Sequence, residues 1–344
     1  MHRTIWIALL ALSLILAACA PANNSATVEP TQGAAGALTA AVPSTGMDLD
    51  TIDPAAYSGD IYVAGSSTVY PVTERIAEMF KADGFEGQGN VRIDSIGSGA
   101  GFERFCVNAE SDIANASRAI NEEEVTACQE NGREPIEFRV GTDALAIVVN
   151  PGNEFVAGLT LEELAMIFSN EAASWSDVNP NWPAEPIKRY APGTDSGTFD
   201  FFIEEVMQPV YGDERGEQAF LQAENLQASE DDNVLVQGVA GDPYAIGFFG
   251  YAYFEENAAQ LKILSVEGVE PSFETAESGD YPLARPLFIY SDAAVMQEKP
   301  QVAAFIGYYL TYVSDIIAEV GYFPASQAAL DAARQSWTEA AAGQ

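Results

Sequence analysis

The sequence predicts an α/β fold of about two domains, each built on a parallel sheet flanked by helices. Short apolar runs with strand character alternate along the chain with amphipathic helical runs, an order typical of parallel sheets. From Gly59 onward about 280 residues remain, which is enough for about two domains. Hydrophobic residues make up 48% of the chain, so each domain can bury a large core.

The predicted elements follow one another in short segments. Strands are predicted at residues 61–64, 91–96, 112–114, 144–149, 187–190, 245–249 and 287–290. Helices are predicted at residues 71–82, 102–106, 121–131, 160–168, 199–207 and 234–240, and over most of the chain from residue 300. The uninterrupted apolar run 144–149 is typical of a strand buried on both faces. Residues 174–186 contain two tryptophans and three prolines, and we expect a loop there.

Two local patterns support the helix assignments. Val72, Ile76 and Phe80 recur at helical spacing and give the first helix an apolar face. Thr160 and Glu163 form the sequence pattern of a capping box, which opens the helix that ends near residue 168.

The first 18 residues predict a secretory signal peptide. Arg3 precedes an apolar run over residues 5–18, broken only by Ser13. This run is short for a membrane span, which needs about 20 apolar residues, but it suits a signal. It ends Leu16-Ala17-Ala18-Cys19, which resembles a bacterial lipobox, so we expect cleavage before Cys19 and lipid on that residue. An ordinary cleaved signal with an incidental cysteine is the alternative.

Residues 19–56 are rich in Ala, Pro, Asn, Ser, Thr and Gly and show no apolar periodicity. This composition predicts a flexible tether between a membrane and the folded body. We therefore expect the protein to be lipid-anchored at the cell membrane on its extracytoplasmic side.

The remaining cysteines, Cys106 and Cys128, form a pair if Cys19 carries lipid. Outside the cytosol such a pair favours a disulfide over two free thiols. The closed loop of about 23 residues would stabilise the fold by roughly 3 kcal/mol in the chain-entropy model.

Composition excludes several function classes. The only histidine is His2, inside the predicted signal, so the mature chain cannot use Ser-His or Cys-His catalysis or ordinary histidine-ligated metals. We expect no enzyme activity, no metal and no cofactor. The formal net charge of −36 repels nucleic acid. It would also repel an anionic ligand at long range, so any anion site must be local, buried and built from short-range hydrogen bonds.

One pattern recurs along the chain: a strand ends, a turn rich in Gly, Ser and Thr follows, and a helix begins. It occurs at residues 65–68, 97–101, 117–118 and 193–198. In a parallel sheet such turns lie at the carboxyl ends of strands, where ligands bind. Each turn offers backbone N–H groups and hydroxyls at a helix N-terminus, a combination that suits an anion. Helix capping explains any single turn, but four turns in one chain favour an oxyanion site.

Arg118 follows the third predicted strand and precedes a helix whose first turn carries Glu122, Glu123 and Glu124. Two interpretations are open. The arginine is either a surface residue paired with these acids or a charge-assisted clamp on an oxyanion.

Taken in order, these turns resemble the signature turns of PstS-like phosphate-binding proteins, which serve phosphate ABC transporters. The matching segments are Gly65-Ser66-Ser67-Thr68-Val69-Tyr70-Pro71, Gly97-Ser98-Gly99-Ala100-Gly101-Phe102, Ala116-Ser117-Arg118, Leu159-Thr160-Leu161-Glu162-Glu163-Leu164, Asp195-Ser196-Gly197-Thr198-Phe199 and Ala245-Ile246-Gly247-Phe248. The resemblance covers about residues 59–324.

The resemblance implies a two-lobe type II periplasmic-binding-protein fold. In it, two α/β lobes, each a mostly parallel sheet flanked by helices, are joined by two crossing hinge strands and close over one phosphate. Lobe I would comprise residues 57–142 and 283–344, and lobe II residues 143–282. The crossings should fall near residues 140–149 and 282–290, and closure should be a hinge motion.

The resemblance also implies a set of phosphate-binding residues. The expected donors are Ser67 or Thr68 with the Val69 N–H, Ser98, and from the opposite lobe Ser196, the Gly197 N–H and Thr198. Many relatives carry an aspartate directly after the serine of the third turn, where this chain has Arg118. Many also carry an arginine three or four residues before the Ser-Gly-Thr, whereas the nearest one here, Arg189, lies seven residues before Ser196. We expect Arg118, rather than Arg189, to supply the positive charge.

The lack of an aspartate at position 118 bears on the choice between phosphate and sulfate. Phosphate near neutral pH keeps a proton that sulfate lacks, so a carboxylate acceptor pairs with phosphate and disfavours sulfate by upward of ~1–3 kcal/mol. Asp195 is the candidate replacement, and Asp231 and Asp232 are weaker candidates. The alternative is that Asp195 only caps the following helix.

The sequence therefore predicts a monomeric, lipid-anchored receptor that captures inorganic phosphate and delivers it to the membrane permease of an ABC transporter. One alternative is a binding protein for sulfate, molybdate or tungstate, and another is a phosphate sensor or scaffold without a transport role. A hydrolase with Ser196 as nucleophile is disfavoured because no histidine can act as its base. The bridge between Cys106 and Cys128 would fix the relative aim of the second and third turns.

Overall fold

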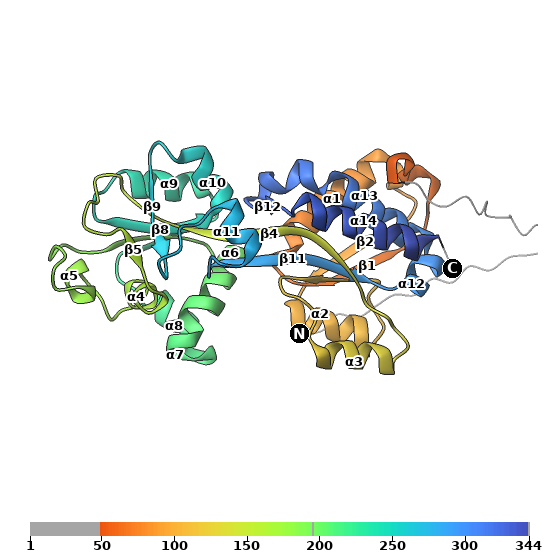
Figure 1. The fold of residues 1–344 in the computed structure, drawn as a ribbon, viewed down its shortest axis with the longest axis horizontal. Coiled ribbons are helices and arrows are strands. Elements are labelled where there is room, and N and C mark those ends of the chain that lie inside the picture. The colour runs from red at the N-terminus through yellow and green to blue at the C-terminus, as the bar shows by residue number, and fades with distance from the viewer. Residues whose placement is uncertain (1–48, 195, 343–344) are drawn as a thin grey trace, which may run out of the picture. The chain divides into compact units, whose positions relative to one another are not determined.

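The computed structural model describes residues 49–194 and 196–342 (Figure 1). The predicted signal peptide, Cys19, most of the tether and Asp195 lie outside the described residues. Within the described ranges, no helix is long and apolar enough to cross a membrane. Ten of the described strands form a mixed sheet with the order β2-β1-β3-β11-β4-β8-β6-β7, in which β9 and β12 each pair with β4. β5 and β10 form a separate two-stranded sheet.

The first half of the sheet contains three parallel strands. β1 (Ile61–Gly65) lies between β2 (Val91–Ser95) and β3 (Ile113–Ala116). One face is covered by α1 (Tyr70–Phe80), α13 (Pro300–Ile316) and α14 (Gln327–Ala341), and the other by α2 (Ser98–Phe102) and α3 (Glu122–Glu130) (Figure 1). Val72, Ile76 and Phe80 are fully buried in this core, which confirms the predicted apolar face of the first helix.

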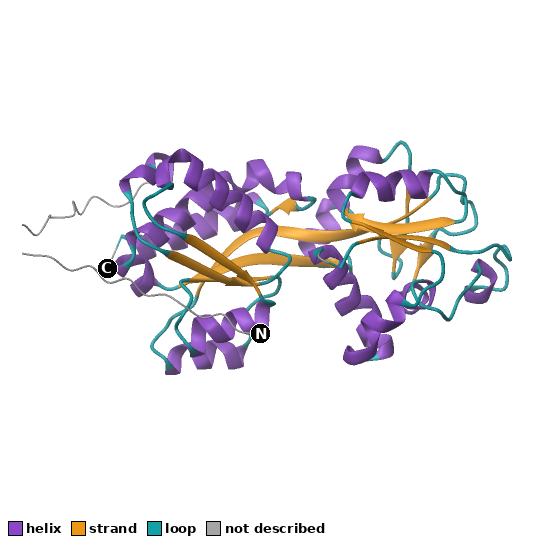
Figure 2. Cartoon of the chain, turned by 180° about the vertical axis from the view of Figure 1, so that it is seen from behind, coloured by secondary structure: helices purple, strands orange, loops and turns teal. Residues whose placement is uncertain are grey.

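The second half of the sheet repeats this plan. β6 (Lys188–Pro192) pairs in parallel with β7 (Leu226–Ser229) and β8 (Ala245–Gly250). α9 (Asp232–Ala240) and α10 (Tyr251–Asn257) lie over one face, and α4 (Leu161–Ile167), α7 (Gln208–Tyr211) and α8 (Asp213–Leu221) over the other (Figure 2).

Two long antiparallel strands, β4 (Ile136–Val149) and β11 (Ala284–Ser291), lie between the halves. The first part of β4 pairs with β11 and its last five residues pair with β8, so β4 belongs to both halves. Leu145 and Ile147 enter one core, whereas Ala146 and Val148 enter the core on the other face. The run 144–149 is therefore buried on both faces, as predicted.

The remaining elements are short. They are β5 (Gly158–Leu159), α5 (Trp175–Val178), α6 (Gly197–Phe202), β9 (Lys262–Ile263), β10 (Ser265–Val266), α11 (Phe273–Ser278), α12 (Ala293–Glu298) and β12 (Phe323–Pro324). π-Helical turns follow α1, α2 and α6 at Lys81–Phe85, Glu103–Val107 and Ile203–Met207, and 3-10 turns occupy Leu49–Thr51, Pro54–Ala56 and Ile317–Val320. Within the segment expected to be a loop, Ser174 and Asp177 form a capping box that starts α5. Alternating strands and helices in two parallel groups confirm the predicted α/β fold class.

Candidate functional site

The first two turns pack directly against each other. Gly65 ends β1 with φ 145°, and a Cβ there would lie 2.1 Å from the Asn115 carbonyl oxygen of β3, so only glycine fits. A Cβ on Gly101 would lie 2.5 Å from the Gly65 Cα. This close backbone approach places the turn before α2 beside the turn before α1.

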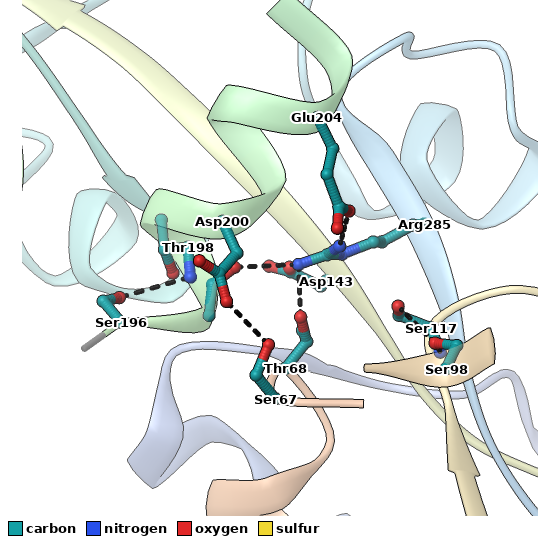
Figure 3. Close-up of polar contacts among 11 residues, drawn as sticks. Ser67, Thr68, Ser98, Ser117, Asp143, Ser196, Thr198, Asp200, Glu204 and Arg285 are labelled. Carbon is teal, nitrogen blue, oxygen red and sulfur yellow. Dashed lines mark hydrogen bonds and ion pairs between the residues drawn. The ribbon is translucent and has the colours of Figure 1, made fainter. Parts of the chain in front are cut away.

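The second and third turns are joined by two serines. The Ser117 N–H donates to the Ser98 Oγ at 3.1 Å, and the two hydroxyl oxygens lie 3.2 Å apart (Figure 3). From the first turn, Thr68 is almost fully buried and Ser67 is partly exposed. Val69 is fully buried at the N-cap of α1. The three turns of the first half therefore bring their hydroxyls to one edge of the sheet.

Arg118 forms a two-pronged ion pair with Glu124. Its Nη1 and Nη2 lie 2.8 and 2.7 Å from the two carboxylate oxygens. Glu124 also closes the capping box of α3 with Asn121, so the carboxylate is held in place. The arginine side chain is 43% exposed and faces the cleft described below. The structure therefore shows the pairing with a helix acid, and the clamp on an oxyanion stays a prediction.

Arg285 of β11 is a functional candidate that sequence reasoning missed. It is 7% exposed and contacts both halves of the sheet (Figure 3). Its Nε donates to the Asp143 carboxylate at 3.1 Å, and its Nη1 to Glu204 at 3.3 Å. Its Nη2 donates to the Thr68 hydroxyl and, at 2.9 Å, to the Gly197 carbonyl oxygen.

Asp143 lies in β4 and is fully buried. Burial raises the pKa of its carboxyl, and the charge and hydrogen bond of Arg285 act in the opposite direction. Its second oxygen, Oδ1, has no hydrogen-bond partner among the described residues. β4 also contains Glu137 and Arg139, so the charge of Asp143 did not by itself single out this pair in the sequence.

Arg118, Arg285 and the first three turns line a cleft of about 640 Å³. The first half contributes the three turns, and the crossing strand contributes Arg285 and Pro286. The second half contributes Glu204, Glu205 and Gln208. The lining residues from the three turns of the first half are Ser66, Ser67, Thr68, Ile96, Gly97, Ser98, Gly99, Ala100, Ser117, Arg118 and Ala119. The cleft thus combines two arginines with several hydroxyls, the donor set that an oxyanion requires.

The fourth turn lines a different cavity. Ser196, Gly197 and Thr198 start α6 and line a space of about 170 Å³ together with acidic and phenolic groups, namely Glu230, Asp232, Tyr253 and Tyr322. The Ser196 hydroxyl is used locally, because it accepts from the Thr198 N–H at 3.2 Å. The structure therefore places eight of the nine predicted binding residues in two separate groups, and the ninth, Asp195, lies outside the described residues.

The two groups meet at Thr68 and Gly197. A Cβ on Gly197 would lie 2.7 Å from the Thr68 Cα, so the backbones are in contact. Beside them the Ser67 hydroxyl donates to the Asp200 carboxylate at 2.8 Å. Contacts between the first and fourth turns are thus present, although their hydroxyls face different cavities.

Arg189 is a buried residue whose hydrogen bonds hold the backbone of the second half. It is fully buried, and its guanidinium donates to the backbone carbonyl oxygens of Ile167, Ala172, Ile187 and Glu224. Burial lowers its pKa to about 10. All of these partners are carbonyl groups of the second half, which gives Arg189 a role in holding loops together.

The weaker acceptor candidates lie at the start of α9. Asp231 caps this helix by accepting from the Asn233 N–H. Asp232 lines the smaller cavity, and burial, with added repulsion from Asp231 and Glu230, raises its pKa to about 6.

The predicted disulfide is present. Cys106 and Cys128 are bonded, which ties the π-helical turn after α2 to α3. Both helices follow turns that line the larger cleft.

Comparison with known proteins finds one matching family and several similar proteins. Residues 24–312 match the family described as PBP superfamily domain. Protein SphX of Synechococcus elongatus is 44% identical over 282 residues, 79% of each chain. The phosphate-binding protein PstS of Staphylococcus saprophyticus is 37% identical over 257 residues, 73% of this chain and 76% of that one. The crystal structure of a possible phosphate binding protein from Planctomyces limnophilus is 36% identical, with a TM-score of 0.75 over 83% of this chain and 99% of that one.

Proposed function

The chain belongs to the PBP superfamily, among the PstS-like phosphate-binding proteins, and from this premise we propose that it captures inorganic phosphate and delivers it to the permease of an ABC transporter. The observation that carries the proposal is the larger cleft, where Arg118 and Arg285 face the hydroxyls of Thr68, Ser98 and Ser117. The cleft is also lined by Glu204 and Glu205, so in a chain of net charge −36 the case for an anion rests on these directional N–H and O–H donors rather than on an excess of positive charge.

The chemistry of the cleft suits a tetrahedral oxyanion. Phosphate carries oxygens on all sides and can accept hydrogen bonds from groups on several elements at once. Arginine offers a planar fork of N–H donors that is well matched to phosphate oxygens. Arg285 is already fixed by Asp143 and Thr68, so little side-chain entropy is lost when it engages a ligand.

Ser196, the Gly197 N–H and Thr198 complete the proposed site from the second half. The Gly197 backbone already touches Thr68, and closure of the two predicted lobes, residues 57–142 with 283–344 and residues 143–282, would turn this helix start toward Ser98. Asp195 remains the proposed acceptor for the phosphate proton. Exchange of Asp195 for Asn should then narrow the preference for phosphate over sulfate.

We further propose that the protein is a monomer held at the extracytoplasmic face of the membrane by lipid on Cys19, with residues 19–56 as tether. Mass spectrometry of the membrane-extracted protein should find the lipid on Cys19. A Cys19→Ser variant recovered from membranes as fully as the parent protein would contradict this anchoring.

Thermal unfolding with a panel of oxyanions tests the proposed ligand. Phosphate at 100 times its Kd should add about 2.7 kcal/mol to the free energy of unfolding, because it binds only the folded state. Sulfate and molybdate at the same concentration should add much less. A melting temperature that phosphate leaves unchanged would support a scaffold that has lost its ligand, and an equal response to sulfate would support a general oxyanion receptor.

A further inference from the structure

Glu204 places a carboxylate against the arginine that the proposed ligand would use. It is the second residue of the π-helical turn after α6, and its Oε2 lies 3.3 Å from the Arg285 Nη1 (Figure 3). Its side chain is 56% exposed and lines the larger cleft. A half-exposed carboxylate therefore lies at the wall of the cleft proposed to bind an anion.

The hydrogen-bond partners of Arg285 differ in how far they are exposed. Its Nε is held by the fully buried Asp143, and its Nη2 by Thr68 and the Gly197 carbonyl oxygen. Among the partners that the described residues supply, the half-exposed one is Glu204, which contacts Nη1. Nη1 is therefore the edge of the guanidinium that a ligand in the cleft can reach, and it is the edge that Glu204 occupies.

We propose that Glu204 is a competing anion that occupies Nη1 of Arg285 when no oxyanion is bound, and that it must be displaced or neutralised when the oxyanion binds. This inference rests on the proposed function, because it assigns a residue that sets the affinity of the same site. Glu204 would act as an internal substitute for the ligand at Arg285.

Electrostatics around Glu204 support competition. Partial burial raises the pKa of Glu204, and Asp200 and Glu205 add to the shift, whereas Arg285 and Arg118 oppose it. An anion that arrives beside Arg285 adds another negative charge near this carboxylate. Binding should therefore be coupled to proton uptake by Glu204 or to its rotation out of the cleft.

A second role for Glu204 makes the opposite prediction. If its carboxylate accepted the proton of hydrogen phosphate, its removal would weaken phosphate binding and strengthen sulfate binding. If it competes, its removal strengthens the binding of both anions, because both need Arg285.

Calorimetric titration of Glu204→Gln with phosphate and with sulfate separates these roles. We expect both affinities to rise by about tenfold, equivalent to ~1.4 kcal/mol. Glu205→Gln is the matched control, because Glu205 lines the same cleft and its removal subtracts the same charge one residue away. Its effect should stay below about threefold, since screened charges without a direct contact couple weakly.

The pH dependence adds a readout that a structural role would not produce. The ratio of the Glu204→Gln affinity to the parent affinity should approach one as the pH falls, because Glu204 then becomes neutral in the parent protein as well. The titration of phosphate itself cancels in this ratio.

Two results would overturn the inference. One is an unchanged phosphate affinity in Glu204→Gln while the parent protein binds phosphate, which leaves the proposed function intact. The other is weaker phosphate binding with stronger sulfate binding, which would make Glu204 the proton acceptor. Absence of phosphate binding in the parent protein would overturn the proposed function and this inference together.

Discussion

Exchange of Arg285 for methionine should destabilise the protein strongly even without ligand. The change removes the cation that faces Asp143, a carboxylate that is fully buried and already has one unpartnered oxygen. It also removes the donor shared by the Thr68 hydroxyl and the Gly197 carbonyl oxygen. Methionine keeps most of the side-chain volume and its contact with the Phe201 ring, which lies 3.8 Å from the guanidinium carbon.

The size of the effect follows from the burial of the pair. Removal of one partner of a buried ion pair costs about 3–5 kcal/mol, because the remaining charge stays buried. Replacement of both partners by apolar residues is often neutral. We therefore expect a loss of about 3–5 kcal/mol for Arg285→Met, and recovery of most of it when Asp143→Leu is added.

Urea unfolding of the phosphate-free protein, followed by circular dichroism, measures both variants. Lowering the pH should shrink the deficit of Arg285→Met, because burial already raises the pKa of Asp143 and loss of the arginine raises it further, so the carboxyl becomes neutral in the folded state. A loss below about 1 kcal/mol, or a double variant as unstable as the single one, would refute the account of this pair.

Three further outcomes are expected. Arg118→Ala should weaken phosphate binding more than Arg189→Ala in calorimetry, whereas Arg189→Ala, which removes buried donors from four carbonyl groups, should lower the melting temperature more. The reverse order of affinities would place the clamp in the second half. Reduction of the disulfide should cost about 3 kcal/mol in urea unfolding and weaken phosphate binding, and an unchanged affinity would make the bridge purely structural. Burial raises the pKa of Asp232 to about 6, so its charge destabilises the fold as the pH rises from about 4 to 6, by up to about 3 kcal/mol. Asp232→Asn should therefore raise the melting temperature at about pH 8 but not at about pH 4, and an equal gain at both, or in the exposed control Asp231→Asn, would contradict this.

The fold could be predicted because its signals are local. Thr160 with Glu163 starts α4 as a capping box, as the sequence indicated. The apolar run 144–149 became a strand with both faces buried. Such patterns depend on residues a few positions apart, and the order of strands and helices then restricts the topology.

The site could be predicted only in part, because its decisive contacts are distant in sequence. Arg285 and Asp143 are separated by 142 positions, and no local motif connects them. A turn-by-turn search finds Thr68 and Ser98, but it cannot find an arginine that reaches them from a crossing strand. The partner of Arg118 was open for a similar reason, since the helix acids offered three carboxylates and the capping box of α3 selects Glu124.

Local sequence patterns also could not predict which turns line the same cavity. The sequence shows that Ser196 and Thr198 start a helix after a strand, and the structure confirms that start at α6. Which cavity they face depends on how the second half lies against the first. That arrangement is set by contacts such as Thr68 with Gly197, which involve backbone rather than a recognisable motif.

Isothermal titration of the protein with phosphate, and with sulfate as competitor, tests the central claim most directly. The account predicts saturable binding of one phosphate per chain, with sulfate weaker by at least about a hundredfold, or ~2.7 kcal/mol. A chain that releases no heat with phosphate, or that binds sulfate equally well, would contradict it.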